Sequence, residues 1–433
     1  MLRTTVCYKI AKLQKFKDSL LKWSQNYDEV VWLDSNNHDA HYGTYDVLVA
    51  VDGLTAISTD ANNGFSDLEE YQSQVRDWIF GYLSYDLKND TERLSSKNYD
   101  GLEFPELYFF QPKKIIGIQG DAVHFIYLNM VSDEINEDFE AIKNFIFESK
   151  SDTKESGDVH IKMRIFKDEY FTKVNQMLAH IHKGNIYEAN FCQEFYAENL
   201  SIDAVKIYTK LNQISKPPFA TYVKLFDKYI MCASPERYLM KIGTKLISQP
   251  IKGTAPRSKD LEIDERLKIN LQKDEKERSE NVMIVDLVRN DLSKSAEKGS
   301  VVVEELCEVY SFEQVHQMIS TITSEVSSEI HPVRLLKETF PMGSMTGAPK
   351  YAAMRIIEEL ESFKRGVYSG AVGYFTPDSD FDFNVVIRSI LYNESKRYVS
   401  YAVGSAITAK SLPEKEYQEC VLKAKAMRQV LEE

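Results

Sequence analysis

Several common signals are missing from this sequence. None of its apolar runs approaches the roughly 20 residues that a membrane-spanning helix requires. GxGxxG and P-loop patterns are both absent, so nothing supports a nucleotide cofactor. The five cysteines are scattered, odd in number and without CxxC spacing, which argues against structural zinc and favours reduced thiols (Cys7, Cys192, Cys232, Cys307 and Cys420).

Positive charge is also scarce, since 53 Lys and Arg stand against 66 Asp and Glu, giving a formal net charge of −13. No dense basic cluster offsets this field, so we expect neither nucleic acid nor a membrane as a partner. The basic, amphipathic start has no uninterrupted apolar stretch and no small-residue cleavage site, so we predict no secretory signal and a cytoplasmic location. Any anion site must be built locally, from a metal ion, a few cations and backbone N–H groups.

The composition that remains is that of an ordinary globular protein. In 433 residues, 43% are apolar and 27% charged, enough for one large core or for two subdomains sharing it. The polar stretch 148–159 predicts a linker between an N-terminal region, 1–150, and a C-terminal region, 160–433. Expected strands and helices are mixed along the chain without a repeating βαβ order, which predicts an α+β fold with large antiparallel sheets.

Local patterns place some of these elements. We expect strands at 44–58 and 107–128 in the N-terminal region. Asp168 is expected to cap a helix that ends at Gly184, because apolar residues between them recur at helical spacing. A hairpin is expected from 385 to 406, with its polar turn at 393–397.

The first feature that could carry chemistry is Lys252, in QPIKGT. A Lys beside a Gly at the end of a strand is usually solvated. In a dry pocket its pKa falls below the ordinary value of about 10.4, and the free amine becomes a nucleophile. The residues alone leave both interpretations open.

Two ExxE pairs form the second feature: Glu277 with Glu280, and Glu416 with Glu419. Each pair would lie on one face of a helix, and one glutamate from each helix would suffice for Mg²⁺, which usually takes one or two carboxylates. With 66 acidic residues, acidic pairs of this spacing arise about ten times by chance, so the pairs alone prove nothing. Lys423, four residues beyond Glu419, could meet an anion at the metal.

Arg388 interrupts the apolar run VVIRSILY, and a buried Arg needs an anionic partner. The pairing strand ends in Gly404, Ser405 and Ala406, where backbone N–H groups can approach a ligand closely. An Arg fork with backbone donors suits a carboxylate. The alternative is an Arg at a strand edge that pairs with a nearby acid.

Two further segments are ambiguous. The small-residue loop 343–350 (GSMTGAPK) leads into a helix whose first N–H groups could bind an anion, or it is a plain capped turn. Glu236, in ASPERYL, precedes a strand-like segment leading toward Lys252. A partly buried Glu there could act as a general acid, although most glutamates at such turns are exposed.

Together these blocks resemble the chorismate-utilising enzymes. QPIKGTAPR, KERSENVMIVDLVRNDLSK, FPMGSMTGAPKYAAMRIIEELE, YSGAVGYF and EYQECVLKAKAMR follow the family order over about residues 165–430. VWLDS, WIFGYLSYDL and LYFFQP resemble its amino-terminal region. The family includes anthranilate synthase component I, aminodeoxychorismate synthase component I, and isochorismate and salicylate synthases.

The resemblance implies a two-sheet antiparallel α/β sandwich wrapped by helices, chorismate as the substrate and Mg²⁺ as the cofactor. It implies Glu280 and Glu419 as the metal ligands, with Glu277 and Glu416 as their outer companions. Glu236 matches the acid that helps the C4 hydroxyl leave. The positions that match the lining of the chorismate site are His316, Ser344, Tyr368, Arg388, Gly404, Ser405, Ala406 and Lys423.

Two positions bear on which reaction is implied. The Lys252 form of PIKGT resembles the aminodeoxychorismate synthases, whereas anthranilate and isochorismate-type enzymes have Ala there. This implies a covalent lysine intermediate, whose pocket must depress the pKa of the amine. Glu188 stands where water-using enzymes have Lys and aminating enzymes usually have Gln, so it departs from both patterns.

The ammonia source and a second ligand are also implied by resemblance. No cysteine here lies in a Gly-flanked elbow with a plausible His and acid, so we expect a separate glutamine amidotransferase subunit. Ser35 and Pro218 lie in segments resembling those that form a tryptophan pocket, with ordinary packing between subdomains as the alternative. Anthranilate synthase component I and a non-catalytic binding protein are the rival interpretations of the whole chain.

Overall fold

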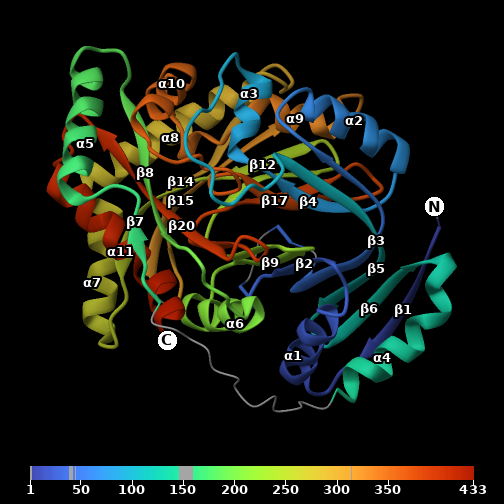
Figure 1. The fold of residues 1–433 in the computed structure, drawn as a ribbon. Helices are drawn as coiled ribbons and strands as arrows, with labels where there is room; N and C mark the ends of the chain where they lie inside the picture. Colours follow the sequence, from blue (N-terminus) through green and yellow to red (C-terminus); the bar gives the residue numbers. More distant parts are fainter. Residues whose placement is uncertain (1, 39–41, 44, 146–158, 314) are drawn as a thin grey trace.

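The structure is a computed structural model that describes residues 2–38, 42–43, 45–145, 159–313 and 315–433. Apart from Val159, the predicted linker lies outside the described residues. Figure 1 shows the strands stacked in the middle of the molecule, with helices around them. Every pairing between these strands is antiparallel, so the predicted α+β fold is confirmed.

The elements follow one another in this order. The N-terminal region contains β1 (Arg3–Lys9), α1 (Leu13–Ser24), β2 (Glu29–Asp34), β3 (Val47–Thr59), α2 (Gly64–Val75), β4 (Ile79–Leu83), η1 (Tyr85–Leu87), α3 (Lys88–Thr91), β5 (Leu107–Gln119), β6 (Ala122–Leu128), η2 (Asn129–Glu134) and α4 (Ile135–Lys143). The C-terminal region contains β7 (Lys162–Met163), α5 (Lys167–His182), β8 (Glu188–Ala197), α6 (Ala204–Ser215), β9 (Phe219–Leu225), β10 (Lys228–Ser234), β11 (Arg237–Ile242), β12 (Lys245–Gln249), β13 (Ile251–Pro256), α7 (Leu261–Lys273), α8 (Glu275–Ser293), β14 (Val302–Ser311), β15 (Val315–Glu325), α9 (Pro332–Thr339), η3 (Gly343–Met345), β16 (Gly347–Ala348), α10 (Lys350–Leu360), β17 (Ala371–Phe375), β18 (Phe381–Val385), β19 (Ser389–Asn393), β20 (Tyr398–Thr408) and α11 (Pro413–Glu432).

The two regions of the sequence share one hydrogen-bonded strand network. β2 lies between β3 and β9, with Trp32 opposite Tyr222. β4 lies between β5 and β17, with Gly81 opposite Gly373. The N-terminal strands therefore complete the sheets of the C-terminal region at two separate edges.

Two large hydrophobic cores flank these strands in the described part of the chain, beside a small third cluster. In the first, inward faces of strands meet one another, as at Phe109 and Phe383, and α8 and α9 add their apolar sides. In the second, outward faces are covered by helices such as α1, α5, α6 and α11 (Figure 1). Neighbouring residues of β8 divide between the cores, Phe191 in the second and Cys192 in the first, because strand side chains alternate.

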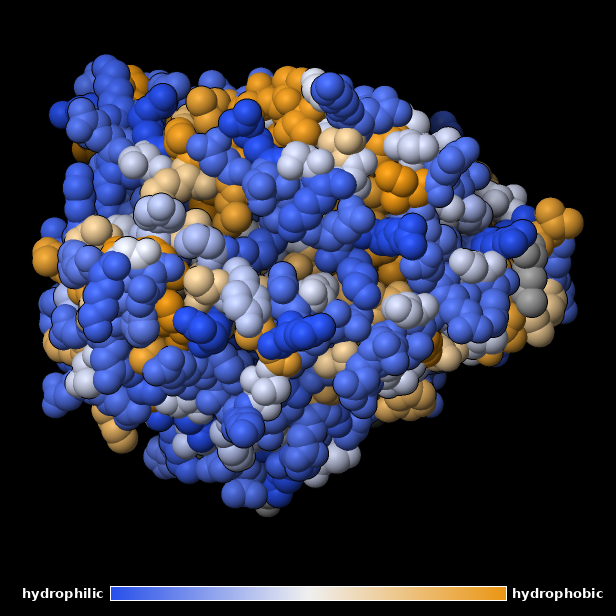
Figure 2. Space-filling view, turned by 90° about the horizontal axis from the view of Figure 1, so that it is seen from above, coloured by the Kyte–Doolittle hydropathy of each residue, from blue (hydrophilic) through white to orange (hydrophobic). Residues whose placement is uncertain are grey.

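Hydrophilic residues dominate the visible surface (Figure 2). The face seen from above in Figure 2 is largely hydrophilic, with apolar residues in small scattered patches. Within the described ranges, no helix is long and apolar enough to cross a membrane.

Three local expectations need correction. α5 begins at Lys167 with Phe166 as its N-cap, so Asp168 lies in the first turn and favours the helix through its charge instead of capping it. The segment predicted as one strand over 107–128 is two strands, β5 and β6, because the chain turns at Gly120, where φ is +58°. The strand predicted over 385–392 is interrupted, since β18 ends at Val385 and β19 begins at Ser389.

Candidate active site

A bulge in β13 aims Lys252 out of the sheet. Ile251 pairs with Ile319 and Thr254 with Gln317, so three steps on β13 oppose two on β15. A bulge of this kind bends a strand and redirects its side chains. Gly253 has a φ of +95°, a left-handed conformation that glycine adopts without strain.

Lys252 meets Glu188, the first residue of β8. The distance from Lys252 Nζ to Glu188 Oε1 is 3.2 Å, and the two side chains are 14% and 3% exposed. Burial lowers the pKa of the Lys252 amine, but the negative charges of Glu188, Glu280 and Glu236 outweigh it, so the pKa is raised. The expected depression of this pKa is therefore wrong: acids surround the amine and hold it as an ammonium ion.

Glu236 lies at the junction of β10 and β11, where its backbone N–H donates to Ser234 Oγ and its carbonyl accepts from Val385. Its side chain is buried. Burial raises the pKa of Glu236 to about 7, with the Ser344 hydroxyl and the charge of Lys252 acting in the opposite direction. A carboxyl group with a pKa of about 7 still carries its proton in a large share of molecules near neutral pH and can donate it.

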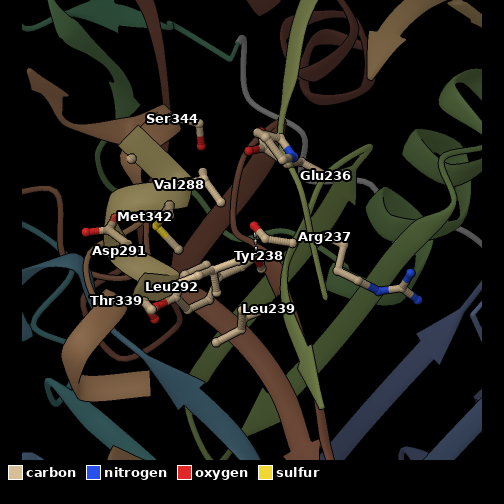
Figure 3. Close-up of a pocket in the computed structure, with 13 residues that line it drawn as sticks. Glu236, Arg237, Tyr238, Leu239, Val288, Asp291, Leu292, Thr339, Met342 and Ser344 are labelled. Carbon is tan, nitrogen blue, oxygen red and sulfur yellow. Dashed lines mark hydrogen bonds between the residues drawn. The ribbon is translucent and has the colours of Figure 1, made fainter. Parts of the chain in front are cut away.

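A pocket runs from this carboxyl group toward α8 and α9. Figure 3 shows Glu236 and Ser344 at one end of it, Tyr238 in its middle, and Arg237 pointing away. Arg237 is held outside by Asp382, with Nε 3.0 Å from Oδ1. The short helix η3 thus brings Ser344, a predicted substrate-site residue of the loop 343–350, to Glu236.

The acidic faces of α8 and α11 converge, as the two ExxE pairs predicted. Burial lowers the pKa of Lys276, but the negative charges of four glutamates outweigh this effect and raise it. These are Glu277, Glu280, Glu416 and Glu419. Burial raises the pKa of Glu277. Four carboxylates from two helices therefore share one small region.

Glu280 and Glu419 differ in how they are held there. Burial raises the pKa of Glu280 to about 7, although Lys252 and Lys276 act in the opposite direction. Burial would also raise the pKa of Glu419, but Lys423, with Nζ 2.6 Å from Glu419 Oε1, outweighs it and the pKa is lowered. Glu419 therefore holds its charge more readily than Glu280.

The two glutamates fit a Mg²⁺ ion by their chemistry. Oε1 of Glu280 is buried without a hydrogen-bond donor among the described residues, and its only ion-pair neighbour there, Lys276 Nζ, is 3.6 Å away. An oxygen of this kind is suited to a cation. No cluster of three or more His, Cys, Asp or Glu side chains with the geometry of a metal cage occurs in the described part of the chain. Mg²⁺ usually takes only one or two protein carboxylates and keeps several waters.

Arg388 lies in the break between β18 and β19, with a left-handed φ of +53°. Burial lowers the pKa of its guanidinium group, while Tyr368 and Glu419 act in the opposite direction. Within the described ranges, that group makes neither a hydrogen bond nor an ion pair. The alternative of an Arg paired with a nearby acid is thus not what the structure has. A largely buried, unpaired cation requires an anion from outside the chain.

Backbone groups of β20 lie beside this region. Lys423 Nζ donates to the Gly404 carbonyl over 2.9 Å. A Cβ at Gly404 would lie 2.5 Å from Cys192 Sγ and 2.7 Å from Asn190 Oδ1, so only glycine fits. The Ser405 hydroxyl lies on the other face, 3.5 Å from a tyrosine hydroxyl of α5, so only its backbone faces the site. Ala406 follows on the site face, opposite Asn190 in the β8 pairing.

His316 is engaged elsewhere. Its Nδ1 lies 2.9 Å from Ser311 Oγ and its Nε2 3.1 Å from Asp264 Oδ1. Arg257 binds the same Asp264. Both ring nitrogens already have partners, so a contact between His316 and a substrate remains a prediction that would require breaking one of them.

The predicted tryptophan pocket involves two adjacent strand ends. Ser35 follows β2 and Pro218 precedes β9, strands that pair with each other. The Ser35 hydroxyl is buried without a hydrogen-bond partner in the described chain. Asp34 beside it is bound by Lys17, with Nζ 2.9 Å from Oδ2. Binding of an amino acid here remains a prediction.

Arg365 is a positioning residue that the sequence analysis missed. Its guanidinium group is buried and donates to the carbonyls of Met345 and Asn190, each over 2.8 Å, and to Glu361 over 2.6 Å. It thus ties η3 to β8 behind the site. The four-residue spacing of Glu361 and Arg365 is the only sequence signal that could have indicated this pair.

Several known proteins resemble this chain in sequence. The family model described as chorismate binding enzyme matches residues 27–429. "Probable aminodeoxychorismate synthase, chloroplastic" of Oryza sativa subsp. japonica is 43% identical over 270 residues, 62% of this chain and 30% of that protein. "Aminodeoxychorismate synthase component 1" of Bacillus subtilis is 31% identical over 385 residues, 87% of this chain and 80% of that protein. Proteins named anthranilate synthase component 1 match with similar identity.

Coverage and fold complete the comparison. The chain spans less than a third of the rice protein and more than half of a similar Escherichia coli one. The crystal structure of anthranilate synthase component I from Streptococcus pneumoniae TIGR4 superimposes with a TM-score of 0.77 at 24% identity, covering 90% of this chain and 94% of that one. At that identity the likeness establishes the fold, and it confirms the expected architecture.

Proposed function

This chain belongs to the family of chorismate binding enzymes, and from that premise we propose that it aminates chorismate at C4 to give 4-amino-4-deoxychorismate. The observation that carries the proposal is the position of Lys252, a buried amine set between Glu188 and Glu236. Relatives named aminodeoxychorismate synthase support it. The chain would act as component I of such a synthase, in the cytoplasm.

Substrate binding uses Arg388, which has no side-chain partner among the described residues, and backbone groups near the end of β20. Arg388 and the N–H groups of 404–406 hold the enolpyruvyl carboxylate, because a guanidinium fork and backbone donors suit a carboxylate. Glu280 and Glu419 hold Mg²⁺, with Glu277 and Glu416 behind them. When bound, Mg²⁺ would neutralise the ring carboxylate and withdraw electron density from the ring.

The reaction proceeds by two displacements. Lys252 Nζ, as the free amine, attacks C2 of the ring while Glu236 gives its proton to the C4 hydroxyl, which leaves as water. Ammonia then adds at C4, and the bond from C2 to Lys252 breaks. Two successive displacements return the new amine to the carbon that lost the hydroxyl, which a single attack at C2 cannot do.

Ammonia comes, in this proposal, from a glutamine amidotransferase subunit, as the printed name "component 1" of the relatives suggests. The product would need a further lyase to give 4-aminobenzoate, the precursor of folate. Anthranilate synthase component I is the rival activity, because proteins of that name also match this chain. Lys252 favours the first reaction, since attack of ammonia at C2 needs no nucleophilic lysine.

The test is to incubate the chain with chorismate, MgCl₂ and an ammonium salt, and to identify the product by chromatography and mass spectrometry. We expect 4-amino-4-deoxychorismate, and a covalent adduct on the peptide containing Lys252 when ammonia is left out. The Lys252→Ala variant is the matched control for the adduct. Anthranilate as the sole product, with no adduct, would refute the proposal.

A further inference from the structure

Glu188 has a single role in the described structure. Its side chain is 3% exposed, and Lys252 is its only hydrogen-bond or ion-pair partner within the described ranges. Burying a carboxylate is costly unless it is paired, and this one is paired only with the amine expected to react. The backbone of Glu188 is fixed on both sides, by Thr408 of β20 and Ala348 of β16, so its position does not depend on Lys252.

We propose that Glu188 accepts the proton that Lys252 must lose before it can attack the substrate. This inference rests on the proposed function. The charges of five acids act on Lys252: Glu188 from β8, Glu277 and Glu280 from α8, Glu419 from α11 and Glu236 from the β10–β11 junction. Among the acids of the described residues, only Glu188 forms an ion pair with Lys252 Nζ, at 3.2 Å.

The other four acids have tasks that conflict with this one, and Glu277 and Glu419 belong with Glu280 to the carboxylates proposed to hold or surround Mg²⁺. Glu236 must still carry its own proton when the C4 hydroxyl leaves, and its burial keeps it in that form near neutral pH. Glu280 is assigned to the metal. Two carboxyl groups in different environments, Glu236 without an ion pair among the described residues and Glu188 paired with the amine, can divide the acid and base roles in one pocket.

The proton balance closes over the cycle. The ammonium group of Lys252 gives a proton to Glu188, and the free amine forms its bond to C2 while Glu236 protonates the departing hydroxyl. Ammonia forms its bond to C4, the C2–Nζ bond breaks, and the surplus proton of the new amine goes to Glu236. Glu188 then returns its proton to Lys252. The sum is chorismate plus ammonia giving the amino product plus water.

A purely electrostatic role for Glu188 would have the opposite effect. A carboxylate that only stabilises the ammonium ion makes the free amine rarer, so its removal would speed the attack. A proton acceptor makes the attack possible at neutral pH, so its removal slows it. The two roles therefore differ in the sign of the effect.

The experiment uses Glu188→Gln in the full chain, with chorismate and MgCl₂ and without ammonia. The rate of adduct formation on Lys252 is measured by rapid quench and intact-protein mass spectrometry from pH 6.5 to 9. We expect the variant to be about 100-fold slower or more near pH 7, a typical contribution of a positioned base. The ratio of variant to wild-type rates should rise about tenfold per pH unit below the pKa of Lys252, because the variant reacts only through its free amine. Taking the ratio cancels the titration of Glu236, which both proteins share.

Two further variants complete the test. Glu188→Asp keeps an acceptor and should restore most of the rate. Glu194→Gln removes another buried carboxylate of β8, one bound by Arg164 and Ser400 away from Lys252, and should leave adduct formation unchanged. Thermal melting of each variant checks the fold.

Adduct formation by Glu188→Gln as fast as by the wild type at pH 7, or a ratio that does not change with pH, would overturn the proton-acceptor role alone. A wild-type protein that forms no adduct would overturn the proposed function as well.

Discussion

Replacing Glu236 by Gln should make the protein more stable at alkaline pH while it loses activity. Gln has the shape of the protonated carboxyl group but no proton to donate. Without that proton the C4 hydroxyl is a poor leaving group, and adduct formation should fall by about 10² to 10⁴. The gain in stability follows from the burial that raises the pKa of Glu236 from an ordinary value of 4.5 to about 7.

The magnitude follows from linkage. Below pH 4.5 the group is neutral in both the folded and the unfolded chain and costs nothing. As the pH rises from 4.5 to 7 the unfolded chain ionises first, so the wild type loses stability relative to the variant, and above pH 7 the difference is constant. A shift of about 2.5 units corresponds to about 3 kcal/mol. For 433 residues, with an unfolding entropy of about 0.9 kcal/mol/K, this is about 4 °C in Tm.

The assay is thermal unfolding of both proteins at pH 5 and pH 8, with the exposed Glu329→Gln as a control for loss of one surface charge. We expect a difference in Tm of about 1 °C at pH 5 and about 4 °C at pH 8, both in favour of Glu236→Gln. Equal Tm values at pH 8 would show that Glu236 ionises in the folded state at its ordinary pKa, and would remove the reason for making it the acid.

Three other substitutions test the remaining groups. Lys252→Arg should form no adduct and no 4-amino-4-deoxychorismate, because a guanidinium group stays protonated; product formation by this variant would contradict the covalent route. Glu280→Gln and Glu419→Gln should each lose turnover at limiting Mg²⁺ while still unfolding in one cooperative transition, and normal activity of either variant would show that its position is not a metal ligand. Arg388→Gln should weaken chorismate binding by about 2 to 4 kcal/mol, roughly 30- to 1,000-fold in Kd measured by titration calorimetry; an unchanged Kd would place the enolpyruvyl carboxylate elsewhere.

Helical spacing accounts for what the sequence predicted well. The glutamates of the two ExxE pairs lie on α8 and α11 as expected, because a spacing of three on a helix fixes which face two residues share. Lys252 was assigned a role only through the resemblance of its segment QPIKGT to the family, because a Lys beside a Gly at the end of a strand is usually solvated. Neither pattern predicts which residues from distant parts of the sequence contact these side chains.

Contacts across long separations account for what it did not predict. The raised pKa of Lys252 depends on Glu188, 64 positions away, and no local pattern encodes that approach. Arg388 was expected within a strand because its neighbours are apolar, but the chain breaks there and adopts a left-handed conformation. Apolar runs indicate burial and do not reveal such interruptions.

The pairing of β2 with β9 and of β4 with β17 has a consequence for engineering. A shortened chain beginning at residue 160 would leave β9 without β2 and β17 without β4. Each would present a row of unpaired N–H and carbonyl groups, a template for pairing with another chain. Apolar residues of the first core, such as Phe383, would lose the N-terminal strand side chains that cover them. Residues 160–433 therefore do not form an independently folding domain, and we expect such a truncated chain to aggregate.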